Sequence, residues 1–215
     1  MKANRLLLIF LFIPLIGLTQ ENEEKKKVFR LDDDTETLAN QKGGFGGFLE
    51  MNTLPTYIHG QPGLMAGGGV SLVFGHSLNL GFAGYGLVSD IHSNVLDSAG
   101  NAFHLQTGYG GMTIEPVLFS KKLIHVSFPV LLGVGATSLT TQSLYDENTY
   151  EESWMNPKMY FVARPGINIE INLLRILRLD LGVNYRFTSG YQMQNISPSM
   201  LNGWSGNIGL KLGWF

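Results

Sequence analysis

The sequence predicts an all-β fold: a transmembrane, eight-stranded antiparallel up-and-down β-barrel. Three observations predict it. Apolar and polar residues alternate in several segments, the connections between these segments alternate in length, and the charged residues within them share one face. The alternation is unbroken from residue 177 to residue 187, where the odd-numbered positions are apolar and the even-numbered ones are polar or glycine. Since successive side chains of a strand point to opposite faces, this period of two indicates strands with one apolar face.

The first element is an export signal, residues 1–19. Lys2 and Arg5 precede an apolar stretch of 13 residues, 6–18. This stretch is shorter than the about 20 residues that a transmembrane helix needs. Small residues at its end predict cleavage before Gln20. The chain has no cysteine, which excludes a lipid-attachment cysteine, disulfides and cysteine-based metal sites.

Residues 20–42 form a second zone that is rich in charge. Seven acidic and five basic residues fall within it, with almost no apolar ones, so a disordered periplasmic tail is expected. Without the signal, the chain carries 13 Lys and Arg against 17 Asp and Glu. This balance gives no electrostatic footprint for nucleic acid. Residues 43–215 are rich in glycine and aromatic residues, and they are predicted to form the barrel domain in the cell outer membrane.

Eight strands are predicted in the barrel domain. The alternation is clearest in the last four, whereas the first four are richer in glycine and leave their register open. Pro55, Pro116, Pro129 and Pro165 fall inside the predicted strands, where a missing ladder donor predicts bulges or strand ends. The predicted strands are residues 44–58, 63–75, 77–89, 103–119, 122–138, 159–174, 176–189 and 203–215.

The connections between the strands give a second signal. Those after the second, fourth and sixth strands are tight turns, whereas those after the third, fifth and seventh are long and polar, residues 89–102, 140–158 and 190–203. Outer-membrane barrels have short periplasmic turns, long outer loops and an even number of strands. Eight strands that follow a periplasmic tail satisfy this rule.

The charged residues indicate which solvent each face meets. Only eight charged residues lie outside the tail, loops and turns, and all eight occupy strand positions that face away from the apolar side. A water-exposed surface would hold about 25–35% charged residues, whereas in a lipid-facing barrel these four acids and four bases would pair in the lumen. Side chains can fill the interior of a barrel of this size, so the pairs are expected to plug it. The predicted lumen ion-pair network comprises Glu50, Glu115, Arg164, Glu170, Arg178, Asp180, Arg186 and Lys211.

Together these features resemble those of the small OmpA/OmpX-type outer-membrane β-barrel proteins of Gram-negative bacteria. The features are the export signal, the alternating strands, the loop parity and the C-terminal residues 209–215. The resemblance implies that the barrel-insertion machinery recognises the last strand during biogenesis, through Leu210, Leu212, Trp214 and Phe215. Phe215 is out of phase with the other three positions.

Catalytic chemistry has few candidates in this sequence. Some outer-membrane barrels are enzymes that use a histidine with a serine and an acid, which draws attention to His104, His125, Ser127 and Glu115. His125 and Ser127 have lumen parity near the periplasmic end, where a packed interior would exclude a lipid substrate, and His104 lies near the outer rim. No catalytic residue is therefore predicted, and the chain is not expected to be an enzyme. The five histidines lack metal-ligand spacing, so neither a metal nor a cofactor is expected.

The long loop at residues 140–158 interleaves acidic and aromatic side chains, and its candidate contact residues are Tyr145, Asp146, Glu147, Tyr150 and Trp154. The sequence favours a non-enzymatic outer-membrane protein with a structural or surface-interaction role. Its expected partners are the outer-membrane lipid, the insertion machinery and a surface partner that contacts the outer loops. Two alternatives stay open: a narrow channel for ions or small solutes, and a lipid-modifying outer-membrane enzyme.

Overall fold

The computed structural model describes residues 45–58, 60–96, 102–140, 157–190 and 198–215. The predicted signal peptide and tail, and the candidate contact residues Tyr145, Asp146, Glu147, Tyr150 and Trp154, lie outside the described residues. No helix in the described residues has the length and hydropathy needed to cross a bilayer. The elements are β1 (Phe45–Ile58), β2 (Gln61–Phe74), β3 (Leu78–Leu87), β4 (His92–Leu96), β5 (Ala102–Leu118), β6 (Ile124–Ser127), β7 (Val130–Thr140), β8 (Lys158–Leu174), β9 (Leu177–Gly190), the 3-10 helix η1 (Pro198–Leu201) and β10 (Gly203–Trp214).

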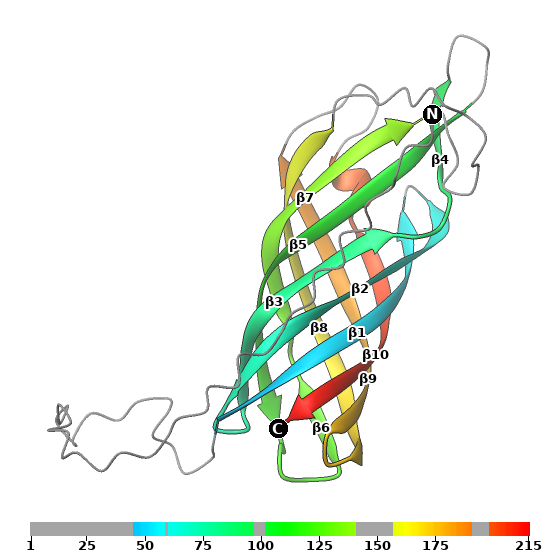
Figure 1. The fold of residues 1–215 in the computed structure, drawn as a ribbon. Helices are drawn as coiled ribbons and strands as arrows, with labels where there is room; N and C mark the ends of the chain where they lie inside the picture. Colours follow the sequence, from blue (N-terminus) through cyan, green and yellow to red (C-terminus); the bar gives the residue numbers. More distant parts are fainter. Residues whose placement is uncertain (1–44, 59, 97–101, 141–156, 191–197) are drawn as a thin grey trace, which may run out of the picture. The chain divides into compact units, whose positions relative to one another are not determined.

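The strands pair antiparallel, and the sheet closes on itself (Figure 1). β1 pairs with β2 on one side and with β10 on the other. The ring continues from β2 through β3 to β5, and from β10 through β9 to β8. β6 and β7 together fill the remaining place, because both pair with β5 and with β8. The predicted antiparallel barrel of eight strands is therefore confirmed.

β6 and β7 form one barrel strand with a two-residue interruption. β6 ends at Ser127 and β7 begins at Val130, but the register against β5 and β8 does not shift between them. Two backbone hydrogen bonds bridge the interruption, from Phe128 N to Pro116 O (3.0 Å) and from Gly166 N to Pro129 O (2.8 Å). These bonds keep the two parts in line, so the fifth predicted strand is present with a break at Phe128 and Pro129.

The prolines correct one expectation. Pro129 lies in the break between β6 and β7, as predicted. Pro55, Pro116 and Pro165 instead lie inside β1, β5 and β8, at positions without a register shift. A proline removes only one donor from the ladder, and the bonds on either side hold the register. The prediction of bulges or strand ends at these three positions is wrong.

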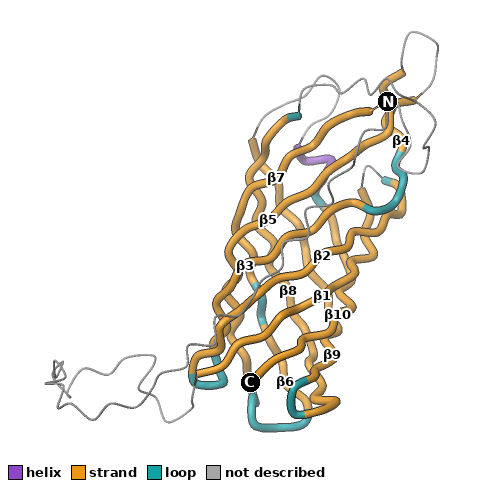
Figure 2. Tube along the Cα trace, in the orientation of Figure 1, coloured by secondary structure: helices purple, strands orange, loops and turns teal. Residues whose placement is uncertain are grey.

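The two ends of the barrel differ (Figure 2). The turn end is formed by the tight connections at residues 75–77, 119–123 and 175–176, and the C-terminus lies there. Gly75 and His76 have φ values of 57° and 59°, which tight hairpin turns require and which glycine adopts at little cost. The opposite, loop end carries β4 and η1. Neither was predicted, since β4 lies within the segment expected to be a polar loop.

Candidate functional site

The outer surface of the barrel is apolar, whereas the charged strand residues point into the lumen. In β9, Val183 and Phe187 are 49% and 52% exposed, whereas Arg186, which lies on the opposite face of the strand, is 1% exposed. In β10, Leu210 is 47% exposed and the neighbouring Lys211 is 1% exposed. The assignment of the apolar face to the outside is therefore confirmed, and the candidate site is the lumen.

A buried ion-pair network occupies the turn-end half of the lumen. Lys211 Nζ donates to Glu115 Oε1 at 2.6 Å and to Glu170 Oε1 at 2.8 Å. Arg178 Nη1 donates to Glu170 Oε2 at 3.2 Å, and Asn79 Nδ2 donates to Glu115 Oε2 at 3.0 Å. These residues come from β3, β5, β8, β9 and β10. Because β10 and β5 do not pair with each other, the network reaches across the lumen and ties its walls together.

Two further acids of the predicted network lie beside it without a cation bridge in the described residues. Asp180 Oδ2 accepts hydrogen bonds from Asn168 Nδ2 at 2.9 Å and from Asn207 Nδ2 at 2.7 Å. Glu50 and Asp180 both line a lumen cavity of about 20 Å³. A cavity of this size has room for about one water molecule.

The remaining two bases of the predicted network are held by aromatic rings, sulfur and backbone. The guanidinium of Arg164 lies 4.0 Å from the ring centroid of Tyr85, which is a cation–π contact. Arg186 Nε donates to the backbone oxygen of Leu201 at 2.6 Å, and its Nη1 lies 3.1 Å from Met65 Sδ. The structure therefore joins Glu115, Glu170, Arg178 and Lys211 in ion pairs and places Glu50, Arg164, Asp180 and Arg186 in the same lumen with other neighbours.

Apolar side chains gather in the loop-end part of the lumen, around the buried guanidinium groups of Arg164 and Arg186. Ile91 and Leu201, which lie outside the barrel strands, complete this cluster and are 0% and 2% exposed. Strand parity shows which face a side chain occupies, but it does not show that every lumen position is polar. The apolar lumen cluster comprises Leu54, Ile58, Met65, Ala83, Tyr85, Leu87, Ile91, Phe103, Leu105, Tyr109, Leu131, Leu139, Tyr160, Val162 and Leu201.

The residues considered for catalysis do not form one site. His125 and Ser127 are fully buried on the lumen face of β6, where no lipid substrate can reach them without opening of the barrel. Glu115 belongs to the ion-pair network. His104 lies in β5 near the loop end, where its Nδ1 is 2.5 Å from Asp90 Oδ1.

The C-terminal strand presents its apolar residues outward, except for the last one. Leu210, Leu212 and Trp214 are 47%, 51% and 75% exposed. The ring of Phe215 instead stacks on Phe48, with centroids 5.4 Å apart, and its own centroid lies 3.6 Å from the Arg178 guanidinium carbon. The out-of-phase position of Phe215 thus directs its ring toward the lumen residues.

Comparison with known proteins finds similar solved structures, although no protein-family model and no curated protein matches the chain. The N-terminal β-barrel domain of Pseudomonas aeruginosa OprF is 9% identical over 78% of this chain and 97% of that chain, with a TM-score of 0.43. Neisserial surface protein A is 11% identical over 78% and 96%, with a TM-score of 0.47. Ail of Yersinia pestis is 10% identical over 79% and 98%, with a TM-score of 0.46.

All three are small eight-stranded outer-membrane barrels. They are of the OmpA/OmpX type that the sequence features resemble. At this level of identity the likeness concerns the fold alone, and it says nothing of a shared ligand or activity.

Proposed function

We propose that this chain is an integral outer-membrane protein with a structural or surface-interaction role and a sealed lumen. The observation that supports the proposal is the set of buried side chains inside the barrel. Buried ion pairs link strands across the turn-end half, and the apolar lumen cluster lies toward the loop end. An eight-stranded barrel has an interior that side chains can fill, and these two groups of side chains would together seal it.

The outer surface supports insertion into lipid. Tyr57 and Trp204 are 64% and 66% exposed toward the loop end, and Phe45 and Trp214 are 65% and 75% exposed toward the turn end. Aromatic girdles at two levels with an apolar band between them are typical of transmembrane barrels. A continuous apolar surface of this kind would be an aggregation hazard in water. The predicted export signal, residues 1–19, is consistent with an outer-membrane location.

The orientation follows from the connections. Short turns face the periplasm in outer-membrane barrels, so the turn end would face the periplasm and the loop end the exterior. The long connections would then form the contact surface for a partner, through Tyr145, Asp146, Glu147, Tyr150 and Trp154. During biogenesis the insertion machinery would bind the last strand through Leu210, Leu212, Trp214 and Phe215.

Single-channel recording tests the sealed lumen against the channel alternative. The refolded mature chain in a planar lipid bilayer is expected to give no steady openings, while a general porin in the same bilayer gives them. Steady openings of the wild type would contradict the sealed lumen. If their conductance changes in Arg178→Ala or Glu170→Gln, but not in Lys121→Ala at an exposed turn, the lumen is a narrow channel. Lys121 is the matched control because it is exposed and lies outside the network.

Mass spectrometry of lipid A tests the enzyme alternative. Outer membranes from cells with and without the protein are expected to carry the same lipid A species. A new species that depends on the protein and disappears in His104→Ala would show enzymatic activity at the loop end and would overturn the non-enzymatic role.

A further inference from the structure

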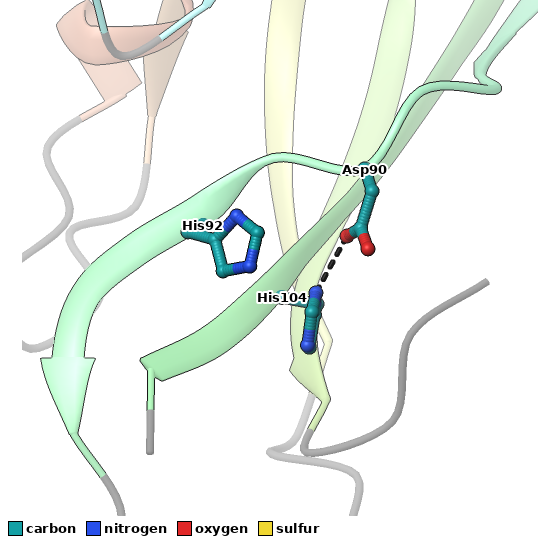
Figure 3. Close-up of side chains that lie close together, drawn as sticks. All are labelled: Asp90, His92 and His104. Carbon is teal, nitrogen blue, oxygen red and sulfur yellow. Dashed lines mark hydrogen bonds and ion pairs between the residues drawn. The ribbon is translucent and has the colours of Figure 1, made fainter. Parts of the chain in front are cut away.

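Three side chains with metal-ligating atoms meet at the loop end (Figure 3). Asp90 precedes β4, His92 is the first residue of β4, and His104 lies in β5. One nitrogen or oxygen atom from each side chain lies within 4.8 Å of the other two. His104 Nδ1 is 2.5 Å from Asp90 Oδ1, and the two imidazole centroids are 4.8 Å apart. These three residues are called the rim cluster below.

The backbone that carries the rim cluster is held on several sides. His92 and His104 are directly opposite each other in the β4–β5 pair. Ile91 is fully buried, and its carbonyl oxygen accepts a hydrogen bond from Leu105 N at 2.8 Å. The side chain of Gln61 in β2 binds both backbone groups of His92. Its Nε2 donates to the His92 carbonyl oxygen at 2.7 Å, and its Oε1 accepts from the His92 amide at 3.4 Å. The cluster is therefore positioned by paired strands and a buried anchor, which favours precise placement of ligands.

The geometry is within reach of metal coordination. Zinc–nitrogen and zinc–oxygen bonds of about 2.0–2.2 Å in a tetrahedron separate the ligand atoms by about 3.4 Å. The Asp90–His104 contact of 2.5 Å would have to open by about 1 Å, and atoms at the 4.8 Å limit would have to approach by about 1.4 Å. Rotation about the side-chain bonds of the three residues would supply both changes. The Asp90 and His104 side chains are 23% and 15% exposed, and His92 is exposed, so an ion can enter from outside without crossing the lumen.

The donor set determines the class of ion. Two imidazole nitrogens and one carboxylate oxygen suit Zn²⁺, Cu²⁺ or Ni²⁺, whereas Ca²⁺ and Mg²⁺ prefer oxygen ligands. We propose that Asp90, His92 and His104 bind one divalent transition-metal ion of this class, with Zn²⁺ as the reference ion. Three protein ligands leave a coordination position open to an external group. The ion would also fasten the residues before β4 to β5 at the loop end.

The position of the cluster explains why spacing along the chain did not reveal it. His92 and His104 are twelve positions apart in the sequence, and only the β4–β5 pairing brings them together. A histidine–aspartate hydrogen bond at the rim is the plain structural explanation of the same contact. The two explanations differ in whether His92 matters and in whether a metal binds.

Calorimetry on the refolded mature chain in detergent tests the proposal. Zn²⁺ is expected to bind at one equivalent with an affinity that falls by about tenfold or more in each of His92→Ala, His104→Ala and Asp90→Asn. His76→Asn at the turn end removes an imidazole outside the cluster and should leave the affinity unchanged. A hundredfold excess of Ca²⁺ should not displace Zn²⁺.

A second measurement uses the wild-type chain, so it does not depend on the folding of any variant. Zn²⁺ is expected to protect His92 and His104, but not His76, from carbethoxylation measured by mass spectrometry. Absence of Zn²⁺ binding would leave only a histidine–aspartate hydrogen bond and would overturn the proposal. Equal binding by the wild type and the His92→Ala/His104→Ala double variant would place the ion elsewhere in the chain, with the same consequence. An unchanged affinity in Asp90→Asn would overturn the three-ligand site.

Discussion

Replacement of Lys211 by methionine probes the ion-pair network most sharply. Lys211 is 1% exposed, and its ammonium group donates to Glu115 and Glu170 at 2.6 and 2.8 Å. Among the described residues, its loss leaves Glu170 with Arg178 and leaves Glu115 with the side-chain amide of Asn79. Each charged hydrogen bond contributes about 1.5–3 kcal/mol, and removal of one partner of a buried ion pair costs about 3–5 kcal/mol. We expect Lys211→Met to lower the free energy of unfolding by about 3–5 kcal/mol.

Urea unfolding in lipid vesicles, followed by tryptophan fluorescence, measures this change. With an m-value of about 2 kcal/mol per molar urea, the midpoint should fall by about 1.5–2.5 M. Lys121→Met at an exposed turn is the matched control and should not shift the midpoint. Lys211→Met/Glu115→Gln should regain about 1 kcal/mol or more, because the uncompensated carboxylate is gone. A loss below about 1 kcal/mol in Lys211→Met, or a larger loss in the double variant, would refute the buried network as a source of stability.

Two further substitutions test the packing of the lumen and the lipid contact of the outer face. Gly135→Ala would place a Cβ against the ring of Tyr160, and it should cost about 1–3 kcal/mol of unfolding free energy. Gly86→Ala, where nothing lies within 4 Å of the new Cβ, should be neutral. Equal effects of the two substitutions would contradict a tightly filled lumen. Val183→Arg in the middle of β9 should cost about 2–4 kcal/mol in a bilayer, and an unchanged midpoint of urea unfolding in vesicles would show that this face does not meet lipid.

The sequence predicted the barrel well because lipid and lumen impose opposite demands on alternate residues. This contrast is strong in β10, where the buried Lys211 stands between the exposed Leu210 and Leu212. β4 escaped prediction because it is five residues long and pairs with β5 through an irregular register. Short strands of this kind carry too few residues to show a period.

The contents of the lumen were harder to predict than its walls. Near the loop end, some of the strand positions that face the lumen carry apolar residues, such as Leu54, Leu139 and Val162. Both faces of the strand are apolar at these positions, so the alternation of apolar and polar residues loses its contrast. Partner choice was also hidden, since Lys211 and Glu115 are 96 positions apart and lie on strands that do not pair. Parity could place both groups in the lumen, but only the closed ring sets them opposite each other.

Site-directed spin labelling along β9 tests most directly the central claim, that the apolar face meets lipid. The chain has no cysteine, so a single label can be attached at Leu179→Cys, Leu181→Cys or Val183→Cys, with Lys121→Cys at an exposed turn as the water reference. In lipid vesicles the three β9 labels should collide often with O₂ and rarely with a water-soluble nickel complex, unlike the label at the turn. Access of the nickel complex to the β9 labels equal to that at the turn would contradict the account.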